Sequence, residues 1–179
     1  MDKKRKSVLF LGGTLGLIII ILLLKFIFNS QISREIPKIS DSATLSNTVK
    51  EQISEAFKNA RRNPSAENIG FLGMVYHSSA NYAEAAKCYE LASNRSKTDW
   101  IWNYYCGYLN MEMGESDAAI RNFTSVTGKN PNIDLAWYYL GDEYKNLRNN
   151  DLAEKSYGKI TNNKSNSLSA NKATRQDHF

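Results

Sequence analysis

The feature that most constrains this chain is a 34-residue spacing that recurs at several kinds of position. Glycine occurs at Gly73, Gly107 and Gly141, and the same spacing separates alanines, aromatic residues and aliphatic residues, namely Ala85, Ala119 and Ala153, then Tyr89, Phe123 and Tyr157, then Ala92, Val126 and Ile160. A repeat of this length is typical of stacked helical hairpins. Each hairpin leaves one apolar face uncovered, and stacking buries that face. The spacing therefore predicts a helical solenoid.

The residues of the third unit resemble the tetratricopeptide repeat (TPR) family. That unit carries the full pattern as Trp137, Leu140, Gly141, Tyr144, Ala153 and Tyr157. The first unit differs only by Ile69 in place of the tryptophan. The second unit is looser, with Asn103, Cys106 and Asn110 at the tryptophan, leucine and tyrosine positions. The resemblance covers 66–164 and implies an all-α solenoid of about three units, 66–99, 100–133 and 134–164.

Small residues at Gly73 and Ala85 are expected to let two antiparallel helices approach closely, with Tyr89 and its equivalents filling the space between one pair and the next. Ahead of the repeats, an amphipathic stripe of Leu45, Val49, Ile53, Phe57 and Ala60 predicts a leading capping helix over 45–65. No apolar period follows Ile160. The last helix then has an open flank, which is either a docking face or a frayed end.

The N-terminal part contains an uncharged apolar run from Val8 to Leu24, and the apolar character resumes over 26–28. This length crosses a bilayer, and no A-x-A-like site follows it, which favours an uncleaved anchor over a signal peptide. The basic cluster Lys3–Lys6 predicts a cytoplasmic N-terminus. We therefore expect 1–28 to form a basic tip and a transmembrane anchor that contacts the membrane through 8–28. The repeats of this single-pass protein should lie outside the cytoplasm, or in the periplasm of a bacterium.

Two polar segments are expected to have no packed structure. Residues 29–44 contain Pro37 and show no sustained period, so we interpret them as a tether, and 165–179 are predicted to be a disordered tail. The first 30 residues contribute +4 and the last 19 contribute +2 to the net charge of +5, so 31–160 carries −1. A folded body without excess positive charge argues against nucleic-acid binding.

No catalytic, cofactor-binding or metal-binding motif is found in the sequence, so we predict neither an enzyme nor a small-molecule substrate. The two histidines, His77 and His178, lack metal-ligand spacing, and His77 is interpreted as a surface or helix-end residue. Cys88 and Cys106 lie on neighbouring predicted helices. They form either a disulfide or packed small hydrophobic residues, and the second reading is the default.

The TPR resemblance implies a concave groove lined by the first helix of each pair. The predicted protein-binding residues there are Met74, Ile101, Tyr104, Tyr108, Met111, Leu135, Tyr138 and Asp142. Tyrosines offer apolar area and a hydroxyl, which suits an extended peptide or a partner helix. The alternative is that the tyrosines are packing between helices. Some family members hold a carboxylate with Lys, Arg and Asn side chains, and the resemblance places Gly70, Met74, Tyr105, Leu135 and Tyr139 at the matching positions, which argues against such a clamp.

Together these features predict a membrane-anchored TPR scaffold for protein–protein interaction, acting as an assembly or maturation factor for a membrane or envelope complex. The alternative is a constitutive structural subunit of a larger membrane protein complex. Stoichiometry separates the two, since a subunit stays in the purified complex and an assembly factor leaves it.

Overall fold

The computed structural model describes residues 3–39 and 45–160, with side chains from Gly16 onward. Short connections join helices throughout these ranges, and no strand occurs within them. The predicted tail, 165–179, and the end of the third unit lie outside the described residues. The helices are α1 (Lys3–Glu35), α2 (Asn47–Arg62), α3 (Ala66–Ser78), α4 (Tyr82–Arg95), α5 (Ile101–Glu112), α6 (Ser116–Lys129) and α7 (Asp134–Asn146), followed by helical residues 150–160.

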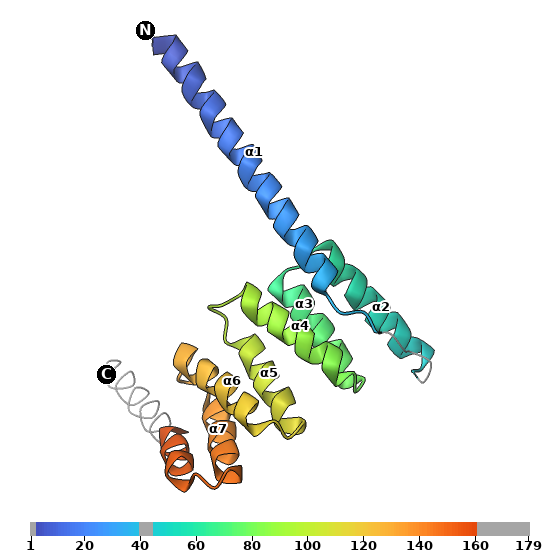
Figure 1. Cartoon of the computed structure of the whole chain (residues 1–179), viewed down its shortest axis with the longest axis vertical. Coiled ribbons are helices and arrows are strands. Elements are labelled where there is room, and N and C mark those ends of the chain that lie inside the picture. Colours follow the sequence, from blue (N-terminus) through green and yellow to red (C-terminus); the bar gives the residue numbers. More distant parts are fainter. Residues whose placement is uncertain (1–2, 40–44, 161–179) are drawn as a thin grey trace, which may run out of the picture.

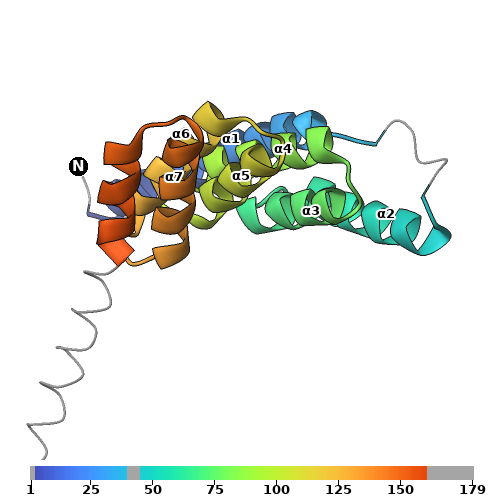
Figure 2. The ribbon, with the colours of Figure 1, turned by 90° about the horizontal axis from the view of Figure 1, so that it is seen from below.

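The helices after α1 form antiparallel hairpins that follow one another in chain order (Figure 1). α3 packs on α4 and α5 on α6, while α4 also packs on α5 and α6 on α7. Viewed from below, α2 to α7 form one row (Figure 2). The prediction of an all-α stack of helix-turn-helix units is confirmed.

Each hairpin closes over its repeated glycine. A Cβ atom added to Gly73 would meet the ring of Tyr89, and Gly107 and Gly141 are covered in the same way by Phe123 and Tyr157. The close approach predicted from the spacing is therefore present. The aromatic residue, however, lies over the glycine of its own pair, and Tyr89 additionally stacks on Tyr105 of the next unit, with ring centroids 5.5 Å apart.

The turns inside the hairpins also repeat every 34 residues, through backbone conformation rather than residue type. Ala80, Gly114 and Arg148 all have positive φ, at 59°, 74° and 59°. In each unit this left-handed residue reverses the chain between the two helices. Only the second unit uses glycine there, so the other two units accept a strain of about 1–2 kcal/mol.

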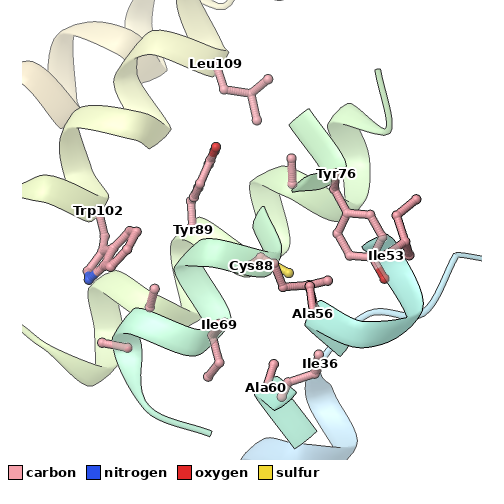
Figure 3. Close-up of a cluster of buried hydrophobic side chains, with 14 residues drawn as sticks. Ile36, Ile53, Ala56, Ala60, Ile69, Tyr76, Cys88, Tyr89, Trp102 and Leu109 are labelled. Carbon is pink, nitrogen blue, oxygen red and sulfur yellow. The ribbon is translucent and has the colours of Figure 1, made fainter. Parts of the chain in front are cut away.

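The buried side chains form two clusters. The first runs from α2 to α5 and includes Ile53, Ile69, Leu72 and Tyr76 (Figure 3). The second lies between α6 and α7 around Phe123, Val126 and Leu140. Partly buried aromatic residues surround the second cluster, among them Trp100, Tyr104, Tyr108 and Tyr139.

The segment interpreted as a tether is corrected in part. α1 continues to Glu35, and Ile36 is buried in the first cluster, where Ile32 and Ile39 pack beside it. The hydroxyl of Tyr76 donates a hydrogen bond of 2.9 Å to the carbonyl of Pro37. Residues 29–39 are thus the foot of α1 and part of the packed body, because their isoleucines fall on one side of the chain. Positions 40–44 of the predicted tether lie outside the described residues.

The upper part of α1 is apolar and exposed. The stretch Gly16–Glu35 contains a window of mean hydropathy 1.9, none of which is buried. A helix of this length and composition fits either a membrane span or a signal sequence.

α2 begins at Asn47, where the hydroxyl of Ser46 accepts a hydrogen bond from the Val49 backbone N–H, and its buried residues include Ile53 and Ala60 from the predicted stripe.

Candidate protein-binding surface

Four tyrosines of α5 and α7 form a connected surface, which we call the tyrosine face: Tyr104, Tyr108, Tyr138 and Tyr139. Tyr139 joins the two helices, because its ring centroid lies 6.2 Å from that of Tyr104 and 5.8 Å from that of Tyr108. Tyr138 is 46% exposed, whereas Tyr104, Tyr108 and Tyr139 are half-buried. The face therefore combines helix packing with the accessible ring of Tyr138, and the predicted protein-binding role of these tyrosines stays a prediction.

The other predicted groove residues divide between three surroundings. Met74 and Ile101 pack against the first buried cluster, and Met111 packs against the second. Leu135 is exposed at the start of α7. Asp142 accepts a hydrogen bond of 2.6 Å from the Tyr157 hydroxyl, which ties the edge of the tyrosine face to the last helix. The structure thus links Tyr104, Tyr108 and Tyr138 through the ring of Tyr139, and Asp142 lies beside Tyr138.

Tyr104, Tyr138 and Tyr157 stay protonated at neutral pH, because the pKa of each phenol is raised. Burial, followed by the neighbouring Tyr139, raises the pKa of Tyr104 to about 12. Burial and the hydrogen bond to Asp142 raise the pKa of Tyr157 to about 12, and the charge of Asp142 raises the pKa of Tyr138. A protonated phenol both donates and accepts hydrogen bonds. This surface can therefore bind peptide groups and apolar side chains together.

His77 joins the first two units, a role that the helix-end interpretation did not foresee. Its Nε2 lies 2.7 Å from Oε2 of Glu112 at the end of α5, and its Nδ1 lies 3.3 Å from the Tyr89 hydroxyl. The rings of Tyr82 and Tyr108 contact the imidazole. These partners are 5 to 35 residues away in sequence, so only the fold brings them together.

A polar cleft of about 400 Å³ on the other side of α5 was missed by sequence reasoning. It lies between α4 and α6 and is lined by Ala86, Glu90, Ser93, Asn94, Asn103, Cys106, Leu109, Asn110, Ala118, Arg121 and Asn122. Asn103, Cys106 and Asn110 stand 34 residues after Ile69, Leu72 and Tyr76, which are fully buried in the first unit. Smaller and more polar residues at these three positions open the cleft. The departure of these three positions from the repeat pattern was the sequence signal for the cleft.

The two cysteines are free thiols. Cys88 is buried in the first cluster, and Cys106 is half-buried at the cleft. Burial raises the pKa of each thiol to about 12, so both are protonated at neutral pH. Within the described part of the chain, no group of three or more His, Cys, Asp or Glu side chains could hold a metal ion.

Comparisons with known proteins support the repeat assignment. Residues 66–99 and 135–166 match the tetratricopeptide repeat family, and the unmatched stretch between them is the looser second unit. No curated protein matches the chain. A crystal structure of MamA has a TM-score of 0.64 and 20% identity over 69% of this chain and 72% of that one. YrrB, a TPR protein with an unusual peptide-binding site, has a TM-score of 0.55 and 20% identity over 72% and 69%. At these identities the likeness shows the fold alone.

Proposed function

We propose that this tetratricopeptide repeat protein is a membrane-anchored scaffold that binds an extended peptide or a helix of a protein partner on its tyrosine face. It works outside the cytoplasm, as an assembly or maturation factor for a membrane or envelope complex. The observation that carries the proposal is the accessible Tyr138 beside the half-buried Tyr104 and Tyr108.

The chemistry of the tyrosine face supports a peptide partner. TPR proteins bind peptides, and YrrB has a peptide-binding site. Tyrosine rings supply contact area at a low entropic cost, because only two side-chain torsions become fixed. The pKa of Tyr104, raised to about 12 by burial, keeps its hydroxyl protonated at neutral pH.

Two features support anchoring through α1. Its exposed side chains over 17–24 are all Leu or Ile, which suits a lipid environment. The foot of the same helix is built into the packed body through Ile36 and Pro37. The basic cluster 3–6 precedes the apolar run, which orients the N-terminus to the cytoplasm and the repeats to the other side.

The test is purification of the full chain in mild detergent, followed by identification of the proteins that remain bound. The variant Tyr108→Ala/Tyr138→Ala removes two rings of the tyrosine face. The matched control Phe71→Ala/Tyr82→Ala removes two exposed rings of α3 and α4. We expect the wild type and the control to keep a partner that the tyrosine-face variant loses, with unchanged helix content by circular dichroism. Retention of the same partner by all three proteins would contradict the assignment.

Stoichiometry in the same preparation separates the two roles. An assembly factor is expected below one copy per complex and absent from the mature complex. A constant one-to-one ratio through every purification step would instead support the structural subunit.

A further inference from the structure

The foot of α1 is fixed to the repeat array at two places. The guanidinium of Arg95, in the last turn of α4, donates a hydrogen bond to Oδ1 of Asn29 and lies 5.4 Å from the ring centre of Phe28. The hydroxyl of Ser33 donates a hydrogen bond of 3.1 Å to the carbonyl of Arg61 at the end of α2. The direction in which α1 leaves the array is therefore set by contacts with two other helices.

These contacts determine which edge of the array faces the membrane. α4 and α6 run roughly antiparallel to α1, and their C-terminal ends lie on the side from which α1 rises (Figure 1). The N-terminal ends of α3, α5 and α7 lie on the same side, because successive helices are antiparallel. We call this side the α1-side edge. If the span ends near Phe28, Arg95 sits at the level of the lipid headgroups, since it contacts Phe28 itself.

The α1-side edge is basic, whereas the opposite edge is rich in carboxylates. The basic residues of the α1-side edge are Arg61, Arg62, Arg95 and Lys129, in the last turns of α2, α4 and α6, and Lys97, which follows α4. Its acidic residues are Glu67 and Asp134, in the first turns of α3 and α7, and Asp99, which precedes Trp100. The opposite edge includes Glu112, Glu115, Asp117 and Asp151 beside Lys145 and Arg148. Helix dipoles favour basic residues at every C-terminus. Of the three helices that end on the opposite edge, α3 has His77 and α7 has Lys145 in its last turn, and α5 has no basic residue there.

All three tryptophans of the chain lie at the α1-side edge. Trp100 is the N-cap residue of α5, while Trp102 and Trp137 occupy the first turns of α5 and α7. Trp100 and Trp137 are half-buried, and Trp102 is buried. Tryptophan is enriched where protein meets the headgroup region of a membrane. The edge thus combines the two side-chain types that favour that region.

We propose that the α1-side edge lies on the membrane that α1 spans and binds its anionic phospholipid headgroups through Arg62, Lys97 and Lys129. The proposal rests on the anchoring part of the proposed function. The array then lies along the membrane surface instead of hanging from a flexible tether. Each basic side chain near an anionic surface shifts the bound population by roughly fivefold, so three of them shift it on the order of a hundredfold.

The experiment measures tryptophan fluorescence of the full chain in nanodiscs that carry a nitroxide-labelled lipid headgroup. Discs of phosphatidylcholine are compared with discs that also contain phosphatidylglycerol. The variant Arg62→Glu/Lys97→Glu/Lys129→Glu reverses three exposed charges and leaves Arg61 and Arg95, which hold α1, unchanged. The matched control Lys50→Glu/Lys145→Glu/Arg148→Glu makes the same charge change on the opposite edge.

We expect quenching in the anionic discs that weakens in neutral discs, in high salt and in the α1-side variant, and that persists in the control. Equal quenching of the two variants, or none in any disc, would overturn the proposal. Binding of the wild type to soluble poly-glutamate, without quenching in any disc, would overturn it too and assign the edge to an acidic protein. Co-elution of the chain with the discs is a separate measurement, and its loss would reject the anchor itself.

Discussion

The first and second repeat units share one pattern but differ in what fills the space between their outer helices. In the first unit, Ile69, Leu72 and Tyr76 are fully buried between α2 and α4. In the second unit, the equivalent positions are Asn103, Cys106 and Asn110, and they border the polar cleft of about 400 Å³ between α4 and α6. α5 and α6 nevertheless remain paired, because Phe123 still covers Gly107. A repeat can thus lose part of its own core when its neighbours hold it on both sides.

The strongest test of this comparison gives the first unit a residue of the second. The substitution Tyr76→Asn copies position 110 and removes a fully buried ring together with its hydrogen bond to Pro37. We expect the free energy of unfolding to fall by about 3–5 kcal/mol, measured by urea denaturation of the full chain in detergent. The control Asn110→Ala should change it by less than about 0.5 kcal/mol, because the side chain borders open space. Equal losses would mean that the cleft is closed in solution.

A second prediction concerns the contact that attaches the second unit to the first. Trp102 of α5 lies so close to Gly70 of α3 that an added Cβ would overlap its ring. Gly70→Ala should therefore displace Trp102 and lower the free energy of unfolding by about 1–3 kcal/mol. Gly128→Ala is the matched control, since a Cβ there meets open space and alanine favours the helix by up to about 1 kcal/mol. A neutral Gly70→Ala would show that the second unit does not depend on this contact.

Most of the fold could be predicted from residue spacing. The 34-residue period located the three hairpins, and the stripe containing Ile53 and Ala60 located α2. Spacing works here because each repeated residue meets a neighbour on its own or an adjacent hairpin, so the pattern is local. The left-handed turns at Ala80 and Arg148 escaped this reasoning, because neither residue is the glycine that such a conformation favours.

The parts that could not be predicted depend on contacts between distant segments. Ile32, Ile36 and Ile39 have a helical spacing, but their polar neighbours and Pro37 masked the signal. The pairing of His77 with Glu112 joins residues 35 apart in sequence, and no spacing rule identifies such a pair. Tyr104, Tyr108 and Tyr138 were predicted as groove residues, and their binding role stays a prediction; the placement of Tyr139 between α5 and α7 and the division into packed and accessible rings required the fold.

A third prediction makes the second unit more like the first. Cys106→Leu places a larger apolar side chain at the position of the buried Leu72 and fills part of the cleft. We expect a gain of about 1 kcal/mol in the free energy of unfolding and a rise in Tm of about 2–4 °C by calorimetry. Ser93→Leu, at the rim of the same cleft, is the control and should give no such gain. A destabilised Cys106→Leu would indicate that the polar groups of the cleft need the space.

The smallest expected difference is between the two thiols, one in each unit. Burial raises the pKa of both Cys88 and Cys106 to about 12, so at pH 8 both are protonated and react slowly with Ellman's reagent. The reaction of each should accelerate as the pH rises towards 12. Cys106 borders the cleft and should react several-fold faster than the fully buried Cys88, which the single variants Cys88→Ala and Cys106→Ala resolve. The thiol of Cys88 becomes exposed to the reagent only when the first unit opens. Tyr76→Asn should therefore increase the reaction rate of Cys88 far more than that of Cys106. Parallel acceleration of both thiols would mean that the two units open together, and the contrast between a filled and an opened repeat would then have no counterpart in local stability.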